Sequence, residues 1–261
     1  AAARQLAAHY ALNDSFGALA ALWQRMVGEP QTLADQYRML WEEQFRDDPI
    51  AHYLKTRDRF NATGDPAMLL YLLARCVKNA PRFNKEGAFN QSPDKRRHGM
   101  KPEKMRREIL GVWALLRDRV SISASDFEDA IAEATPGDLV YMDPPYQGVS
   151  TGRDRRYHQG VLRDRVIIAL RSLNARNVPF LLSYDGSCGG RDYGDPLPGG
   201  LAIRLQLQAR VSSQATLSGR HEFTVESLYV SNLLAANCEV LLTRDLQSES
   251  RQLAIQFSAS T

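Results

Sequence analysis

The sequence Leu139-Val140-Tyr141-Met142-Asp143-Pro144-Pro145-Tyr146 joins an apolar run to an acid, a diproline and an aromatic residue. The apolar run indicates a strand, and Asp143 follows at its end. Proline fixes its own φ and favours extended backbone in the residue before it. We therefore expect the Asp143 carboxylate and the Pro144 carbonyl to be held in a fixed arrangement.

This arrangement suits chemistry on a planar amino group. The lone pair of such a nitrogen is delocalised into its ring, and acceptors that draw its hydrogens out of plane make it a better nucleophile. Asp143 and the Pro144 carbonyl can accept those hydrogens together, and Tyr146 offers a face on which a displaced base can stack. The alternative is that these residues only form a turn after a strand, which is a common use of aspartate and proline.

The composition is that of a globular protein, with 44% hydrophobic and 24% charged residues in a chain of 261. No apolar run reaches the length of about 18 residues typical of a membrane helix, and the first residues do not resemble a signal peptide. We therefore expect a cytoplasmic protein without a membrane partner. The three cysteines and five histidines are dispersed, so the sequence predicts neither a disulfide framework nor a metal site.

Positive charge is concentrated in two segments, although the net charge is only +3. Residues 94–108 hold seven Lys or Arg against three acids, and Arg153, Arg155 and Arg156 follow the Asp-Pro-Pro-Tyr sequence. Each cluster alone is typical of a solvated face. Two clusters that flank one candidate site favour a phosphate-rich partner.

Helical and strand-like patterns alternate along the chain, which predicts the α/β class. Residues 30–118 are mostly helical, with helices that begin at Pro66 and Pro102, and they fit an inserted lobe. A loop is expected at 185–200, which is rich in glycine and proline. The other expected elements are helices at 15–27, 127–133 and 161–175, strands ending near residue 14 and at 120–123, 139–142 and 178–183, an antiparallel pair at 201–211 and 223–232, and weaker strands at 238–243 and 253–257.

Several segments together resemble the DNA adenine methylase family of adenine N6-methyltransferases, in which a target-recognition insert precedes an Asp-Pro-Pro-Tyr strand end. Leu12-Asn13-Asp14, followed by an apolar helix, is similar to the second cofactor segment of that family. The resemblance implies that Asp14 holds the ribose of S-adenosylmethionine, and a carboxylate can accept from both vicinal hydroxyls. Alternatively, Asp14 or Ser15 only caps the helix.

The segment Arg82-Phe83-Asn84-Lys85-Glu86-Gly87-Ala88-Phe89-Asn90 is similar to the family's Arg-x-Asn-x-x-Gly-x-Phe-Asn signature in the DNA-reading insert. Arg and Asn can make bidentate contacts with base edges, and the resemblance implies that Phe83 or Phe89 fills the space of a displaced base. The alternative is a turn around Gly87 with a buried Phe89. The preceding Asn79-Ala80-Pro81 departs from the family's Asn-Gly, so the family's target sequence does not carry over.

Two further segments extend the resemblance. Ser125-Asp126-Phe127 resembles the segment that holds the cofactor adenine, which implies that Phe127 stacks on the adenine and that Asp126 accepts its amino group. Alternatively, Asp126 only caps the following helix, and Phe127 only makes a core contact. Arg210-Val211-Ser212-Ser213 resembles a late DNA-contacting segment, although such residues are surface residues by default. The expected DNA-binding residues are Arg82, Asn84, Asn90, Lys95, Arg96, Arg97, Arg155, Arg156, Arg210 and Ser212.

The resemblance covers about residues 4–232 but lacks the family's opening strand and its Phe-x-Gly-x-Gly motif. Those glycines let the backbone approach the methionine part of the cofactor. Residues 1–10 resemble the helix that follows the motif, which implies either a truncated chain or a second chain that supplies the missing piece. A permuted loop at Gly186-Ser187-Cys188-Gly189-Gly190 is an alternative.

The resemblance therefore implies a Rossmann-like methyltransferase sheet in residues 1–29 and 119–261, with a helical DNA-recognition insert at 30–118. The implied cofactor is S-adenosylmethionine, and the implied substrate is adenine in double-stranded DNA, for restriction-modification or genome marking. Asp143, Pro144 and Tyr146 are the expected catalytic residues, and Asp14, Asp126, Phe127 and Asp143 the expected cofactor-binding residues. The alternatives are a catalytically incomplete DNA-binding subunit and an enzyme that methylates RNA or protein glutamine, a class that more often carries Asn before Pro-Pro-Tyr.

Overall fold

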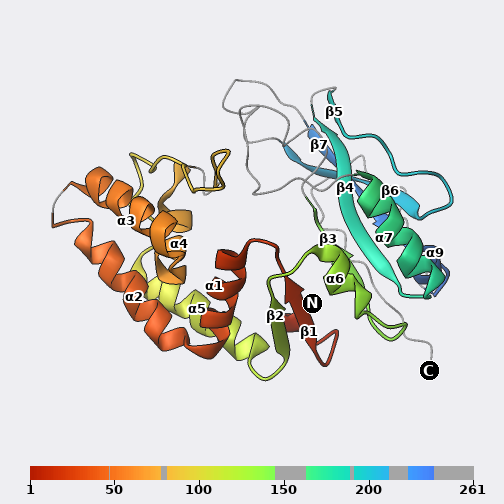
Figure 1. Cartoon of the computed structure of the whole chain (residues 1–261), viewed down its shortest axis with the longest axis horizontal. Helices are drawn as coiled ribbons and strands as arrows, with labels where there is room; N and C mark the ends of the chain where they lie inside the picture. Colours follow the sequence, from red (N-terminus) through yellow and green to blue (C-terminus); the bar gives the residue numbers. More distant parts are fainter. Residues whose placement is uncertain (47, 78–80, 145–162, 189–190, 212–222, 238–261) are drawn as a thin grey trace. The chain divides into compact units, whose positions relative to one another are not determined.

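The protein has a mixed α/β fold in two compact units (Figure 1). The computed structural model describes residues 1–46, 48–77, 81–144, 163–188, 191–211 and 223–237. Among the described residues, unit 1 comprises Ala1–Ala130, and unit 2 comprises those from Ile131 onward. Within the described ranges, no helix is both long enough and apolar enough to cross a membrane.

Proline begins four helices of unit 1, and this explains where they start. These helices are α2 (Pro30–Glu43), α3 (Pro49–Thr63), α4 (Pro66–Arg75) and α5 (Pro102–Leu116), and α1 (Gly17–Gly28) precedes them. Proline suits the first turn because the N–H that it lacks has no acceptor within the helix there. The Asp48 and Asp65 side chains each accept two backbone N–H groups at the starts of α3 and α4.

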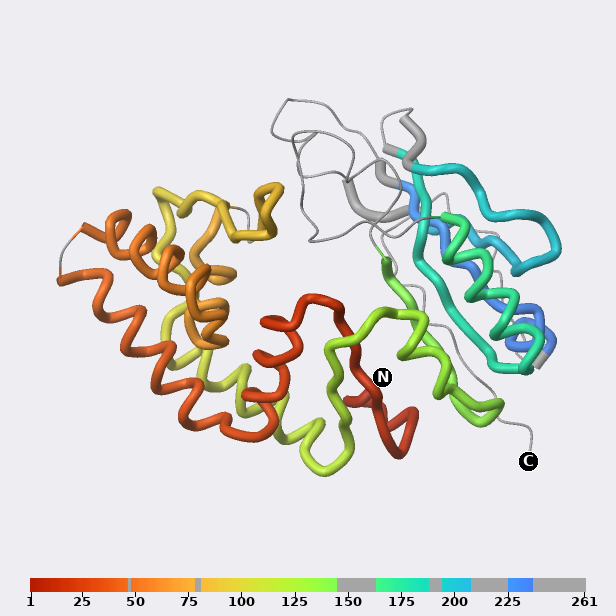
Figure 2. Tube along the Cα trace, viewed as in Figure 1, coloured from red at the N-terminus to blue at the C-terminus, as the bar shows by residue number. Residues whose placement is uncertain are grey.

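The core of unit 1 lies between these helices. Three tyrosines, Tyr37, Tyr53 and Tyr71, are fully buried in it, together with leucines of α2 and α4 such as Leu33 and Leu72. Burial of each such side chain stabilises the fold by about 1.5–3 kcal/mol. Segment 81–100 runs back beside α3 and α4 (Figure 2), where Pro93 forms a β-bridge with Cys76.

Two parallel strands complete unit 1. Strand β1 (Tyr10–Asn13) pairs with β2 (Val120–Ser123), with Tyr10 opposite Val120 and Asn13 opposite Ser123. Half-buried and exposed residues alternate along both strands, as expected of a sheet with one covered face. Parallel strands need a long crossover, and α1–α5 provide it. The carboxyl ends of both strands therefore meet at one edge.

Unit 2 is built on a second sheet with the strand order β3-β4-β7-β6 and with β5 attached to β4. Its strands are β3 (Val140–Met142), β4 (Phe180–Cys188), β5 (Arg191–Tyr193), β6 (Ile203–Val211) and β7 (Phe223–Val230). β3 and β4 are parallel, and the other pairs are antiparallel. Helix α7 (Arg163–Ala175) lies along one face of this sheet (Figure 1), with Val166, Leu170 and Leu173 buried.

Two short helices flank the second sheet. Helix α6 (Phe127–Ala132) precedes β3, and α9 (Asn232–Asn237) follows β7. Just after α7, the Arg176 guanidinium donates to the carbonyls of Ile131, Ala132 and Ala134 at 2.9–3.0 Å. These bonds satisfy carbonyls that the end of α6 and the following turn leave without helical donors.

Most of the expected secondary structure is confirmed. Helices begin at Pro66 and Pro102, the strand at 120–123 is present, and the strand expected at 139–142 covers Val140–Met142. The two strands expected at 201–211 and 223–232 form an antiparallel pair, Ile203–Val211 with Phe223–Val230. The weaker strands expected at 238–243 and 253–257 lie outside the described residues. The division into 1–29, 30–118 and 119–261 stays a prediction.

The loop expected at 185–200 is partly wrong, because β4 continues to Cys188 and pairs with β5 and β7. Gly186 permits this continuation. A Cβ atom at Gly186 would lie 2.3 Å from the Val225 carbonyl oxygen, so β7 can approach only a glycine there. The permuted cofactor loop is wrong for residues 186–188 for the same reason; Gly189 and Gly190 lie outside the described residues.

The helix expected over residues 1–10 is also wrong. A single 3-10 turn, η1 (Ala2–Arg4), ends at Gln5, whose φ of 51° is left-handed. Tyr10 then begins β1, because its backbone pairs with Val120.

Candidate functional site

Asn13 joins the carboxyl ends of β1 and β2. Its Oδ1 accepts the Ser123 hydroxyl at 2.8 Å, and the backbone N–H and hydroxyl of Ser125 at 3.0 and 2.9 Å. Its Nδ2 donates to the Ser125 carbonyl at 3.0 Å. Asp14 follows Asn13, and Asp126 follows Ser125. The hydrogen bonds of Asn13 therefore hold the two acids near each other, each just after one of the two neighbouring strands. Sequence reasoning did not assign a role to Asn13.

Asp14 has one carboxylate oxygen engaged. Its Oδ1 accepts the Phe16 backbone N–H at 2.8 Å, and Phe16 is the N-cap residue of α1. No described residue donates a hydrogen bond to its Oδ2. The capping alternative is therefore correct for one oxygen, although neither Asp14 nor Ser15 is the N-cap residue itself.

A cavity of about 360 Å³ lies beside the end of β1. Its lining includes the polar residues Asn13 and Asp14 and the apolar residues Leu12, Trp23 and Ile122. This half-open hollow therefore adjoins the strand end that carries Asp14.

Asp126 and Phe127 begin helix α6. The Asp126 Oδ1 accepts the Glu128 backbone N–H at 3.0 Å, so the capping alternative for this acid is observed. Phe127, the first residue of α6, is half-buried. The structure thus brings Asp14 and Asp126 to one strand edge of unit 1.

Asp143 lies in unit 2, directly after β3. Met142, the last residue of β3, pairs with Leu182, so Asp143 follows the end of β3 at the point where its parallel neighbour β4 continues to Cys188. Neighbouring protein atoms partly desolvate the carboxyl group and raise the pKa of Asp143 above its usual range. The residue still lies on the exposed side of the strand end, and Pro144 is half-buried. Tyr146 lies outside the described residues.

An ionic cluster surrounds the buried Asp185 within β4, and sequence reasoning missed it. Asp185 is 1% exposed; it pairs with the Arg204 guanidinium at 2.5 Å and accepts the Tyr229 hydroxyl. Arg204 also donates to the Ser227 hydroxyl, and the Tyr229 oxygen accepts the Leu197 N–H. The cluster fixes β4, β6 and β7 around the irregular register between Ser183 and Gly186.

The segment predicted to read DNA forms a short hairpin. Phe83 and Phe89 pair as a β-bridge and are buried, with ring centroids 5.7 Å apart. The expectation that one of them replaces a displaced base is wrong, because both rings belong to the core. Asn61 of α3 holds this arrangement by bonding both the N–H and the carbonyl of Phe89 at 2.8 and 2.9 Å.

The outer face of the hairpin carries its polar residues. Arg82 and Asn90 are exposed, and the Asn90 N–H donates to the Arg82 carbonyl at 2.9 Å, so the two are neighbours across the strands. Asn84 is half-buried, and its Oδ1 accepts the Ala88 N–H. Gly87 makes the turn with a φ of 80°.

Lys95, Arg96 and Arg97 are exposed on the next loop. Arg97 pairs with Asp94 at 2.8 Å, whereas Lys95 and Arg96 have no acid partner within the described ranges. The other expected DNA contacts are not described: Arg155, Arg156 and Ser212 lie outside the described residues, as does the side chain of Arg210. The described part of the chain contains no group of three His, Cys, Asp or Glu that could hold a metal ion.

Sequence comparison gives these features a common context. The family model of the D12 class N6 adenine-specific DNA methyltransferases matches residues 1–193. The chain belongs to this family. Its match contains Asp14, Asp126, Asp143 and the hairpin, each described above.

Known methyltransferases are among its relatives. The chain is 26% identical over 162 residues to the Retron Ec67 DNA adenine methylase of Escherichia coli, with 57% of this chain and 54% of the relative covered. It is 26% identical over 189 residues to the Type II methyltransferase M1.LlaDCHI of Lactococcus lactis subsp. cremoris, with 67% and 65% covered. It is 29% identical over 126 residues to a DNA adenine methylase of Serratia marcescens, with 46% and 44% covered. The chain thus spans less than two thirds of the length of these relatives.

Proposed function

We propose that the chain transfers a methyl group from S-adenosylmethionine to N6 of an adenine in duplex DNA. The position of Asp143 and Pro144 at the end of β3, parallel to β4, carries this proposal together with the family match over residues 1–193. The proposal includes a Rossmann-like arrangement of the strands, with residues 30–118 as the target-recognition insert.

Asp143 and the Pro144 carbonyl are the proposed acceptors for the adenine amino group. Two acceptors hold its hydrogens and leave the nitrogen lone pair directed at the incoming methyl group. The nitrogen would gain the methyl as the sulfur–methyl bond breaks and S-adenosylhomocysteine leaves, and it would release one hydrogen as a proton, towards Asp143 or solvent. Removing a base from the duplex costs a few kcal/mol, so a stacking partner is needed, and Tyr146 is the proposed one.

The residues of unit 1 fit the nucleoside part of S-adenosylmethionine. The Oδ2 of Asp14 is available to accept ribose hydroxyls, and the half-buried Phe127 offers a ring for the adenine beside Asp126. When bound, the cofactor supplies a methyl group already activated by its sulfonium. The protein residues then bind and orient the two substrates, which is where most of the rate acceleration is expected.

The methionine part of the cofactor needs close backbone approach, and residues 1–261 contain no Phe-x-Gly-x-Gly. Within the described residues, β1 pairs only with β2, and β3 pairs only with β4. The free edges of β1 and β3 can each accept another strand. We therefore expect residues 1–261 by themselves to bind S-adenosylmethionine weakly.

The proposed DNA surface consists of the outer face of the hairpin and the basic loop. Arg82 and Asn90 are placed to contact base edges or phosphates, with Asn84 beside them. Lys95 and Arg96 are placed for phosphates, because both are exposed and without an acid partner among the described residues. Arg155, Arg156, Arg210 and Ser212 remain part of this proposal on sequence grounds alone.

The test measures methyl transfer to duplex DNA with tritiated S-adenosylmethionine, beside a gel-shift titration. Asp143→Ala should lower the rate by about 100-fold or more, because one transition-state acceptor is removed, while duplex affinity persists. Glu133→Gln, an exposed acid after α6, is the control and should retain full rate. Retention of more than about a tenth of the wild-type rate by Asp143→Ala would overturn the proposed role.

The second candidate function is a DNA-binding subunit without activity of its own, and the observation behind it is the exposed basic surface of Arg82, Lys95 and Arg96. It predicts duplex binding without any methyl transfer, even at millimolar S-adenosylmethionine. Addition of a segment that carries Phe-x-Gly-x-Gly separates the two candidates, because only an incomplete enzyme gains turnover from it.

A further inference from the structure

Four buried side chains hold the basic loop at residues 91–100 by its carbonyl oxygens. Tyr53 donates to Gln91 at 3.0 Å, Arg75 to Asp94, Gln44 to His98 at 3.2 Å, and Tyr37 to Met100 at 2.6 Å. We call these four donors the loop clamp: Tyr37, Gln44, Tyr53 and Arg75. None of the four is more than 2% exposed.

Arg75 and Gln44 form the centre of the loop clamp. The Arg75 Nε donates to the Gln44 Oε1 at 3.0 Å, and the Gln44 amide also donates to the Trp41 carbonyl at 2.8 Å. The Arg75 backbone carbonyl accepts the Asp94 N–H at 2.9 Å, so one residue holds both backbone polar groups of Asp94. Arg75 ends α4, where the helix carbonyls favour a positive charge.

The loop is also folded from within. The Asp94 Oδ1 accepts the N–H groups of Arg96 and Arg97 at 2.8 and 3.2 Å, and these bonds and the Arg97 guanidinium lower the pKa of Asp94. Gly99 has a φ of 84°, and a Cβ there would lie 3.4 Å from the Ala74 carbonyl. The left-handed φ therefore favours a glycine where the loop passes Ala74 of α4.

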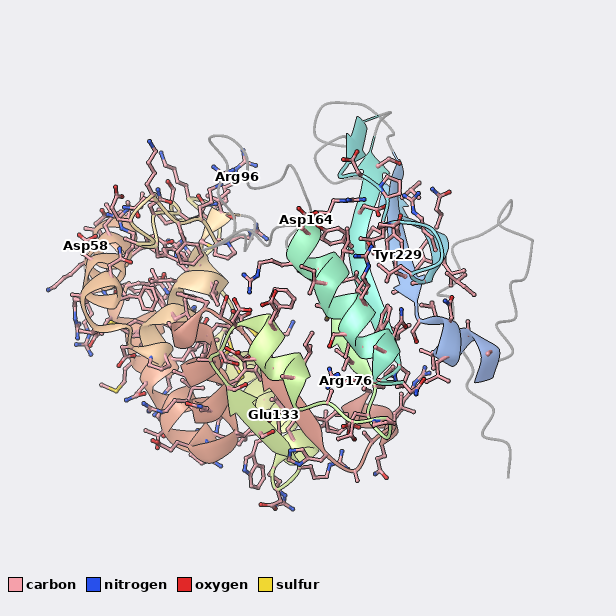
Figure 3. All side chains as sticks on the ribbon, turned by 45° about the vertical axis from the view of Figure 1, so that its right-hand side comes forward. Asp58, Arg96, Glu133, Asp164, Arg176 and Tyr229 are labelled. Carbon is pink, nitrogen blue, oxygen red and sulfur yellow. The ribbon has the colours of Figure 1, made fainter. Side chains whose placement is uncertain are left out.

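The clamped stretch presents positive charge. Lys95, Arg96 and Arg97 lie between the anchors at Asp94 and His98, and all three are exposed; Figure 3 shows Arg96 on this loop. Burial raises the pKa of Tyr37 and of Tyr53 above the usual range, so both phenols remain donors at every pH at which DNA is bound. The loop backbone is thus held from inside while its cations face outward.

We propose that the loop clamp preorganises residues 94–98 as a phosphate-contacting loop, with Arg75 and Gln44 as positioning residues that never touch DNA. This proposal rests on the proposed DNA-binding function. An exposed loop of this length is otherwise flexible, and ordering its backbone and its long side chains on binding would lower DNA affinity. Donors fixed inside the helical core remove that cost before DNA arrives.

Two variants test the loop clamp, and one serves as a control. Tyr37→Phe/Tyr53→Phe removes two clamp donors without changing ring shape. Arg75→Met removes the guanidinium that donates to Gln44 and to the Asp94 carbonyl. Tyr10→Phe is the control, because Tyr10 is a half-buried tyrosine of the same unit whose hydroxyl accepts the Ala7 N–H at 3.1 Å and which does not belong to the loop clamp. If Arg75→Met fails to fold, the double tyrosine variant decides alone.

The first measurement is trypsin cleavage after Lys95, Arg96 and Arg97 in the DNA-free protein. Cleavage reports the population of the open loop. We expect about fivefold faster cleavage for each clamp hydrogen bond removed, and no change in the control. Unchanged cleavage in the double variant overturns the loop clamp.

The second measurement is duplex affinity as a function of salt. Clamp variants should weaken binding by about fivefold for each hydrogen bond removed and raise KM for DNA without lowering kcat, while the salt slope stays that of the wild type. Lys95→Ala/Arg96→Ala should instead reduce the slope by about 0.9 for each phosphate that is no longer neutralised.

Faster cleavage with unchanged affinity overturns the clamp proposal. An unchanged slope in Lys95→Ala/Arg96→Ala overturns the DNA-binding function of the loop and leaves the cleavage result as the measure of the clamp.

Discussion

Asn13, at the end of β1, and Ser125, just after β2, each donate hydrogen bonds to the other and accept hydrogen bonds from it. The amide oxygen of Asn13 accepts the Ser125 N–H and hydroxyl, and its amide nitrogen donates to the Ser125 carbonyl. Because the residues that follow are Asp14 and Asp126, this pair sets the spacing between the two acids proposed to hold the cofactor.

Asn13→Ala should weaken S-adenosylmethionine binding about tenfold, because the two acids lose their shared anchor; tenfold corresponds to about 1.4 kcal/mol. The measurement is equilibrium binding of tritiated S-adenosylmethionine to the wild-type protein and to the variant. Ser121→Ala is the control, since Ser121 lies on the same sheet but bonds His9 away from the strand ends. Equal effects of the two substitutions would show that Asn13 has no particular role.

As pH is lowered, the rate of methyl transfer should fall at a pH above the usual pKa of an aspartate. Desolvation raises the pKa of Asp143, so its carboxyl group takes up a proton above the usual value of about 3.8. A protonated carboxyl loses acceptor capacity for the adenine amine. The activity is therefore present above this raised pKa and lost as pH falls through it.

The measurement is the pH dependence of kcat/KM, with duplex affinity recorded at each pH. An acid limb at or below the ordinary aspartate pKa would contradict the role of Asp143, and so would a limb that follows DNA affinity alone.

The sequence predicts well those elements that local chemistry determines. Asp65-Pro66 predicts the start of α4, because aspartate caps and proline fits a first turn, and both effects involve neighbouring residues. The apolar run before Asp143 predicts β3 in the same way. Asp14 and Asp126 were identified from their segments, but the sequence does not say that Asn13 joins them across 112 residues.

The errors arise where tertiary contacts override local chemistry. Phe83 and Phe89 are compatible with stacking on a base and with burial, and only packing against Phe60 and Phe16 places them in the core. Gly186 is typical of a loop, yet close approach by β7 makes it part of a strand. Asp185 and Arg204 lie 19 positions apart, so no local pattern connects them.

Arg204→Met should destabilise unit 2 strongly. Asp185 is 1% exposed, and removal of its cation leaves a buried carboxylate whose remaining donor among the described residues is the Tyr229 hydroxyl. Breaking a buried pair costs about 3–5 kcal/mol, and partial exposure of Arg204 favours the lower end of this range. Arg38→Met, which removes the exposed pair with Asp35, should cost no more than about 1 kcal/mol. Urea unfolding measures both, and similar losses would contradict the buried cluster.

The basic residues at 95–107 should divide into DNA contacts and structural residues. Arg96 is exposed without an acid partner among the described residues, whereas Arg106 bonds both Asp35 and Gln31 and so joins α5 to α2. Arg96→Ala should reduce the log-log salt slope of duplex binding by about 0.9 and leave the free energy of unfolding unchanged. Arg106→Ala should leave the slope unchanged and lower the free energy of unfolding by up to about 1 kcal/mol. Fluorescence anisotropy across a salt series gives the slope, and urea unfolding gives the stability. A reduced slope in both variants would mean that Arg106 leaves Asp35 to contact DNA. An unchanged slope in both would mean that the basic segment is only a solvated face and does not contact DNA.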